Sequence, residues 1–147
     1  MLMCVSAFGQ YAATQSTPTS IPDSGTATPY PSSVDLTKSN ILGLVEKVSV
    51  TVNSLTHPYA PDLGLLLVGP NNNAVVLMSN SGGNSGGSSA LAGATLVFSD
   101  DASAGTPISS PLVSGTSYKP TDNGSDQGGS ISFPGPAPSS PYARTRH

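Results

Sequence analysis

Two short apolar runs, separated by a cluster of turn-forming residues, lie in the middle of the chain. The first runs from Leu63 to Val68, the second from Val75 to Met78, and Gly69 to Asn73 lie between them. Because Gly, Pro and Asn favour turns, the pattern predicts a β-hairpin closed by a longer loop. The first run has almost no polar position, so we expect it to lie centrally in its sheet with both faces covered.

Two other segments have strand character. From Val48 to Val52 the valines fall on one face and the hydroxyl side chains on the other, which predicts a half-buried strand with one face toward solvent. The segment Ala94 to Phe98 has a similar β-forming composition and predicts another strand. Between the second apolar run and this strand, Ser79 to Ser89 is rich in Gly and Ser, which is typical of a flexible loop.

Weaker signals predict short edge strands at 41–45, 112–113, 117–118 and 131–133. No window sustains the 3.6-residue apolar period of a helix. Turn residues recur about every ten positions, a spacing typical of β-sandwiches. The hydrophobic pattern therefore predicts an all-β fold of sandwich type.

Length, charge and hydrophobicity further limit the number of domains and the kinds of partner that we expect. The chain has 147 residues, enough for one domain but not for two with substantial cores. Its net charge is −3, with only five scattered Lys and Arg, which argues against a nucleic-acid partner. No apolar run is long enough for a membrane-spanning helix.

The expected domain organisation has three parts. Residues 1–20 predict either a flexible N-terminal extension or a clipped secretion signal, because their apolar start lacks a basic region. Residues 21–142 form the predicted β-sandwich, and residues 143–147 form a tail. The single cysteine, Cys4, excludes an internal disulfide.

The order of several short patches resembles the P domain, or Homo B module, which follows the catalytic domain of kexin-like and furin-like subtilases. His57 to Leu63 is similar to the His…Asp-Leu motif of that family, and Leu66 to Pro70 to the strand and turn that follow it. The remaining patches of the resemblance are 21–25, 28–32, 47–52, 55–57, 77–79, 82–83, 96–98, 100–102, 114–116, 118–121, 133–134, 136–138 and 141–142. The resemblance implies a jelly-roll-like β-sandwich that is non-catalytic and extracellular or at the cell surface.

The resemblance also implies a calcium site. The candidate side-chain ligands are Asp62, with loop carbonyls just before it, and Asp100 and Asp101 at the end of another strand. Carboxylates and carbonyls in loops are the ligands that Ca²⁺ prefers. Pro61 and Gly64 stand where relatives often carry further acids. An alternative for Asp62 is therefore a turn residue whose carboxylate accepts backbone N–H groups.

The P domain normally continues past the patch at 141–142, with an Asn-Gly-Thr-Trp-type motif and final strands. This sequence contains no tryptophan. We therefore expect a sandwich without its last strands, either because the chain is a fragment or because another chain supplies them.

Other motifs have simpler interpretations. Asp122 to Asp126 is similar to a calcium loop but lacks its third-position and distal ligands, so we expect a solvated turn. Gly83 to Gly87 matches the G-x-S-x-G pattern of hydrolases, but no helix signal follows it. We expect His57 to hydrogen-bond the adjacent loop. The sequon at Asn123 would accept a glycan only in a eukaryotic secretory route.

Together these observations predict a non-enzymatic module that stabilises or positions a neighbouring domain or mediates adhesion. One alternative is a structural subunit completed by strand addition from an identical or different chain. A second alternative is a carbohydrate-binding module, because jelly rolls often bind sugars, although tryptophan for stacking is absent.

Overall fold

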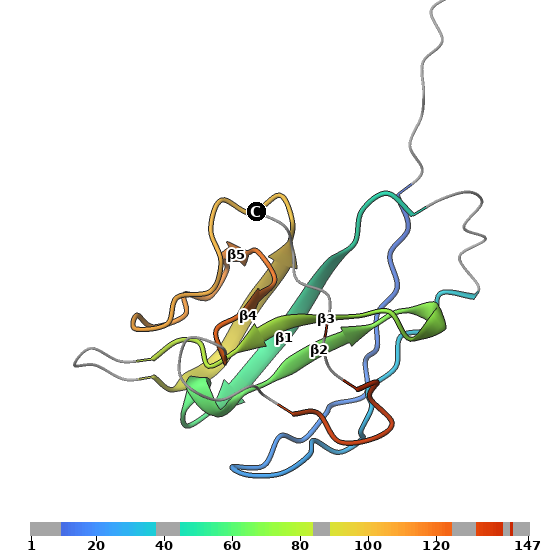
Figure 1. Cartoon of the computed structure of the whole chain (residues 1–147). Coiled ribbons are helices and arrows are strands. Elements are labelled where there is room, and N and C mark those ends of the chain that lie inside the picture. Colours follow the sequence, from blue (N-terminus) through green and yellow to red (C-terminus); the bar gives the residue numbers. More distant parts are fainter. Residues whose placement is uncertain (1–9, 38–44, 84–88, 125–131, 140–141, 143–147) are drawn as a thin grey trace, which may run out of the picture.

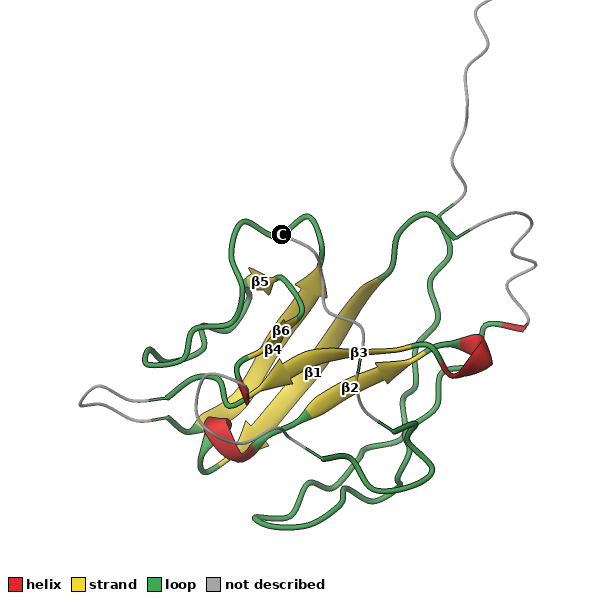
Figure 2. Cartoon of the chain, in the orientation of Figure 1, coloured by secondary structure: helices red, strands yellow, loops and turns green. Residues whose placement is uncertain are grey.

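The computed structural model describes residues 10–37, 45–83, 89–124, 132–139 and 142, and within them the chain is almost entirely strand and loop (Figure 1, Figure 2). This confirms the predicted all-β class. The strands are β1 (Ser49–His57), β2 (Leu65–Val68), β3 (Ala74–Ser79), β4 (Leu91–Ser99), β5 (Ser117–Tyr118) and β6 (Thr121–Asp122). Two short 3-10 turns, η2 (Ala60–Asp62) and η3 (Pro70–Asn72), lie between them.

The strands form two three-stranded sheets, one in the order β1-β4-β5 and the other in the order β2-β3-β6. Both sheets are mixed, because β1–β4 and β2–β3 are antiparallel whereas β4–β5 and β3–β6 are parallel. Strands of both sheets contribute to one hydrophobic core, which gives a sandwich-like arrangement. The buried members of this core are Leu55, Ala60, Leu63, Leu77, Met78, Leu91, Ala94, Leu96, Phe98, Leu112 and Tyr118.

Strand β1 confirms the predicted alternation at Val50 and Val52 and continues it through a bulge, whereas Val48 lies before the strand and is exposed. Val50 and Val52 are half-buried, and the residues on either side of each are exposed. Ser54 has a φ of 55°, and beyond it the buried positions change from even to odd residue numbers. As a result Leu55 and His57 are buried as well.

Strand β4 carries a compensating bulge. The register between β1 and β4 slips by one residue between the pairs at Val52 and Leu55 and has returned at the pair His57 with Leu91. Gly93 has a φ of 68°, and its N–H donates to Thr56 Oγ1 at 2.9 Å. Because a one-residue slip exchanges the two faces of a strand, the paired bulges keep apolar side chains inward at both ends of the sheet.

The β2–β3 pair confirms the predicted hairpin. Leu67 pairs with Val75, and the Gly69 N–H donates to the Asn73 carbonyl at 2.8 Å to close the loop. The prediction that the first apolar run lies centrally is wrong. Among the described strands β2 lies at the edge of its sheet, with residues that are half-buried or exposed, whereas five of the six residues of β3 are buried. The central strand is β3 because β6 pairs with its other edge.

The weaker strand signals are confirmed only in part. Residues 117–118 form β5, which pairs with β4. Residues 112–113 form no strand: Leu112 is buried in the core, and Val113 is exposed. Val45 and residues 132–133 also lie outside any strand, and the positions 41–44 and 131 are outside the described residues.

In the view of Figure 1 the segment 10–37 runs down beside the sheets, and its lower loops lie near the segment 132–139, below the sheets. The Tyr30 hydroxyl donates to the Pro134 carbonyl at 2.8 Å and so joins them. Burial raises the pKa of Tyr30, and the nearby Tyr142 phenol adds to this effect. Within the part of the chain that the structure describes, no helix is long and apolar enough to cross a membrane.

Candidate binding cavity between the sheets

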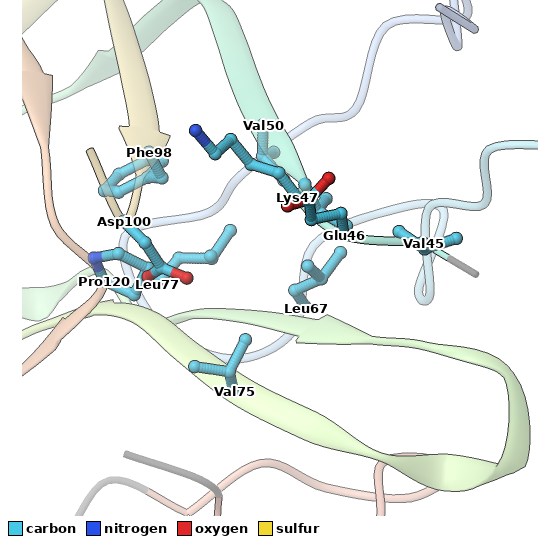
Figure 3. Close-up of a pocket in the computed structure, with 11 residues that line it drawn as sticks. Val45, Glu46, Lys47, Val50, Leu67, Val75, Leu77, Phe98, Asp100 and Pro120 are labelled. Atoms are coloured by element: carbon cyan, nitrogen blue, oxygen red, sulfur yellow. The ribbon is translucent and has the colours of Figure 1, made fainter. Parts of the chain in front are cut away.

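A cavity of about 260 Å³ lies between the two sheets, at the end where β1 and β3 begin and β2 and β4 end (Figure 3). Its apolar lining includes Val50 and Phe98 from one sheet and Leu67, Val75 and Leu77 from the other. The cavity reaches the surface, because two further lining residues, which lie just before β1, are exposed. These are Val45, at 61 %, and Val48, at 52 %.

Two cross-strand pairs form the opposite walls of this cavity. Val50 pairs with Phe98 in one sheet, and Leu67 pairs with Val75 in the other. In Figure 3 the Leu67 and Val75 side chains rise from the β2–β3 ribbon toward Val50 and Phe98. Sequence reasoning missed this site, since each residue taken alone is an ordinary inward position of a strand.

Charged side chains surround the mouth of the cavity. Glu46, Lys47 and Asp100 belong to the lining, and Lys47 Nζ donates to the Asp101 carboxylate. This hydrogen bond and the charge of Asp101, together with the charges of Glu46 and Asp100, raise the pKa of Lys47. Three carboxylates thus lie around one ammonium group, and the mouth has an excess of negative charge. All four residues are exposed, so salt in the solvent screens this charge.

The structure separates the three predicted calcium ligands. Asp62 is the last residue of η2, which follows the His57 end of β1. Asp100 and Asp101 follow β4, whose last residue, Ser99, pairs with the opposite end of β1. Strand β1 has nine residues, and at about 3.3 Å per residue its first and last Cα atoms lie up to roughly 26 Å apart. Asp100 and Asp101 are therefore neighbours, but Asp62 is remote from both.

Asp62 contributes one carboxylate at its end of β1, whereas a calcium ion takes six to eight oxygen ligands. Its side chain is exposed, and the two carbonyls before it already accept backbone hydrogen bonds: Tyr59 O from the Asp62 N–H at 3.2 Å, and Ala60 O from the Leu63 N–H at 3.0 Å. In the described residues no group of three or more His, Cys, Asp or Glu side chains could hold a metal ion. The three candidate carboxylates therefore cannot hold one ion together.

His57 joins β1 to the adjacent loop, as predicted. Its side chain is buried, Nδ1 lies 2.8 Å from the Tyr59 carbonyl oxygen, and Nε2 lies 3.4 Å from the Pro22 carbonyl oxygen. These contacts connect the strand to η2 and to the N-terminal loops. They assign His57 a structural role.

A buried polar network lies at the end of β3, where the sequence pattern predicts only flexible loop. Ser81 Oγ donates to the Ser79 carbonyl at 2.7 Å and lies 2.7 Å from Thr106 Oγ1. Ser79 Oγ donates to Asp122 Oδ1 at 2.6 Å. The Asn123 Nδ2 group donates to Ser81 Oγ at 3.0 Å and to the Thr106 carbonyl at 3.1 Å. The network joins β3, β6 and the loop at Thr106.

The network corrects the prediction of a solvated turn at 122–126. Asn123 is only 6 % exposed and Gly124 is buried, while residues 125 and 126 are outside the described residues. The Asn123 amide nitrogen, to which an N-linked glycan would attach, donates both of its hydrogens inside the protein. Once this fold has formed, the sequon is therefore closed to glycosylation.

The G-x-S-x-G pattern is described only at its first residue. The Gly83 N–H donates to the Ile108 carbonyl at 2.8 Å, and a Cβ on Gly83 would lie 2.3 Å from that oxygen. Close backbone packing thus explains this glycine. Residues 84–87 of the pattern are outside the described residues.

No protein family, curated protein or solved structure matches the chain.

Proposed function

We propose that this chain is a non-catalytic β-sandwich module of an extracellular or cell-surface protein, which works by contact with a neighbouring protein domain. In this role it stabilises or positions that domain or mediates adhesion. The observation that carries the proposal is the open apolar end of the sandwich, where Val45 and Val48 expose side chains beside a cavity between the sheets. Exposed apolar surface next to a cavity is the feature that protein and ligand contacts use.

The relationship to P domains and their jelly-roll topology belong to the same proposal. Their support is the order and spacing of the sequence patches, together with an all-β chain whose two sheets share a core. The extracellular setting rests on that resemblance.

Access to the cavity in solution tests the proposal directly. Apolar cavities of about 150 Å³ bind xenon. Under xenon pressure we expect the ¹³C methyl signals of Val50, Leu67 and Val75 to shift, and those of Leu91, which is buried at the far end of β1, to stay in place. Unchanged signals at all four residues would mean that no small apolar probe enters the space between the sheets, and the proposal would lose the observation that carries it.

A second candidate, an assembly subunit, is favoured by the position of β1. This nine-residue strand lies at the edge of its sheet, so among the described residues its outer backbone groups have no strand partner. Sedimentation velocity of the full chain separates the two candidates. An accessory module stays monomeric as its concentration rises, whereas an assembly subunit forms discrete oligomers that Val48→Lys weakens.

Absence of catalysis is part of the proposal and is measured separately. We expect no labelling of the chain by a serine-directed phosphonate under conditions in which a serine protease is labelled completely. Stoichiometric labelling would indicate a hydrolase and would contradict the proposed non-catalytic role.

A further inference from the structure

We propose that the cavity end of the sandwich binds an extended peptide segment that pairs with the edge of β1 that has no strand partner among the described residues, inserts an apolar side chain between the sheets and places a basic residue at the acidic mouth. This inference deepens the proposed function and rests on it, because it names the chemistry of the neighbouring protein segment.

The edge of β1 determines that the occupant is an extended strand. The first four residues of β1, Ser49–Val52, pair in regular antiparallel register with β4 on one side and with no described strand on the other. A peptide added to that edge continues the sheet through backbone hydrogen bonds. Its alternate side chains then face the same way as Val50 and Val52, which is into the space between the sheets.

The cavity determines the size and polarity of the inserted group. Val50, Leu67, Val75, Leu77 and Phe98 line it, so an apolar group is favoured there. Its volume of about 260 Å³ is below the usual range of drug-sized pockets, which starts at about 300 Å³. One or two aliphatic side chains from a strand match this space better than an independent small molecule.

The charges at the mouth of the cavity determine the charge of the peptide residue that lies beside it. Lys47 donates to Asp101, and this one ammonium group is shared with Glu46 and Asp100, so the carboxylates at the mouth exceed the lining cations by charge. A lysine or arginine at the end of the peptide meets these two carboxylates, and an acidic residue there is repelled. The preference is electrostatic and exposed, so it weakens as salt is added.

Synthetic heptapeptides with blocked ends test the proposal on the full chain. The probe KTVTLTK alternates apolar and hydroxyl residues between two lysines, ETVTLTE reverses its charge, and KTSTSTK removes its apolar side chains. A fourth peptide carries N-methyl groups on alternate residues of KTVTLTK and cannot pair fully with a strand. Binding is followed by ¹⁵N and methyl NMR at low salt.

We expect saturable shifts for KTVTLTK at the amides of residues 49–52 and at the methyls of the cavity, with an affinity at least about tenfold above that of ETVTLTE. The serine-containing and N-methylated peptides should bind at least about tenfold more weakly than KTVTLTK. The double variant Glu46→Gln with Asp100→Asn should reduce the preference for the basic peptide to about threefold or less. Both replaced residues are exposed, so the fold should be retained.

The matched control is Asp23→Asn with Asp62→Asn, which removes the same charge from exposed residues remote from the cavity mouth. It should keep the full preference. No saturable binding of KTVTLTK at millimolar concentration, equal affinity of the two charged peptides, or equal binding of the N-methylated peptide would each overturn the inference. If xenon still enters the cavity in that case, the proposed module remains and only its peptide partner is lost; if xenon does not enter, both fail.

Discussion

At the scale of single residues, the fold depends on a few positions where the chain has little freedom. Gly83 and Gly93 illustrate two different reasons for glycine. Gly93 has a φ of 68°, with no atom within 4 Å of where a Cβ would lie, so it serves backbone conformation. Gly83 lies directly against the Ile108 carbonyl, so it serves close packing.

These two reasons predict different costs. Gly93→Ala should lower the free energy of unfolding by about 1 kcal/mol, the cost of a left-handed backbone for an L-residue. Gly83→Ala should lower it by about 3 kcal/mol or more, because backbone has to move. Urea unfolding of both variants beside the wild type measures the difference, and equal costs would contradict the packing role of Gly83.

Asn123 is the residue on which the buried polar network most depends. Asn123→Asp replaces a double donor with an acceptor that faces Ser81 Oγ and the Thr106 carbonyl. We expect a loss of about 2–4 kcal/mol at pH 7, because buried acceptors then face one another. The loss relative to wild type should shrink at a pH below about 4, where the carboxylic acid regains a hydrogen to donate.

Chemical denaturation at the two pH values checks this prediction. Asn73→Asp, at an exposed turn position, is the matched control and should change stability by less than about 0.5 kcal/mol. If Asn123→Asp lowered the free energy of unfolding no more than the control does, the buried polar network would not contribute to stability.

At the scale of elements, the hairpin shows how two similar apolar runs acquire different positions. Strand β3 is paired along both edges, with β2 and with β6, whereas β2 keeps one edge without a partner in the described part of the fold. The partner β6 has only two residues. A very short strand far along the chain therefore decides which run of the hairpin is central.

This difference predicts the outcome of matched truncations. Met78→Ala in β3 removes a side chain with no exposed surface and should cost about 2–5 kcal/mol. Leu66→Ala in β2 removes a half-buried side chain and should cost about 1 kcal/mol. Thermal or urea unfolding ranks the two, and a larger cost at Leu66 would contradict the assignment of β2 to the edge.

Features of this fold that depend on residues close together in sequence could be predicted, whereas features that depend on distant residues could not. The hairpin, the alternation at Val50 and Val52 and the strand at Ala94 to Phe98 depend on neighbours along the chain, so their patterns are visible. The bulge at Ser54 and the burial of Asn123 depend on partners far away in sequence, such as Leu96 and Thr106. A polar stretch therefore resembles a solvated turn until its partners are known.

The candidate site was equally beyond sequence reasoning. The aspartates that suggested calcium share a residue type but lie at opposite ends of β1, as Asp62 and Asp100 show. The cavity arises only where the pair Val50 and Phe98 meets the pair Leu67 and Val75. No local pattern marks residues that two sheets bring together.

At the scale of the whole molecule, one core shared by two sheets should unfold cooperatively and without help from a metal. A ligand at a hundred times its dissociation constant adds about 2.7 kcal/mol, or roughly 5–15 °C for a domain of this size. Since Asp62 and Asp100 lie at opposite ends of β1 and cannot share one ion, we expect the same midpoint, within about 2 °C, in millimolar calcium and in excess chelator. A larger rise of the unfolding midpoint in calcium, abolished by Asp62→Asn, would show that the loop at Asp62 binds calcium.

The bulge at Ser54 also bears on how far association can spread. A long, flat strand edge can recruit copy after copy and grow into a fibre. In β1 the regular stretch ends after Val52, and the change of phase at Ser54 breaks the register for any strand that lies alongside. A guest strand therefore finds only about 13 Å of uninterrupted edge. An edge of that length gives each added strand few backbone hydrogen bonds, which weakens any growth into a filament.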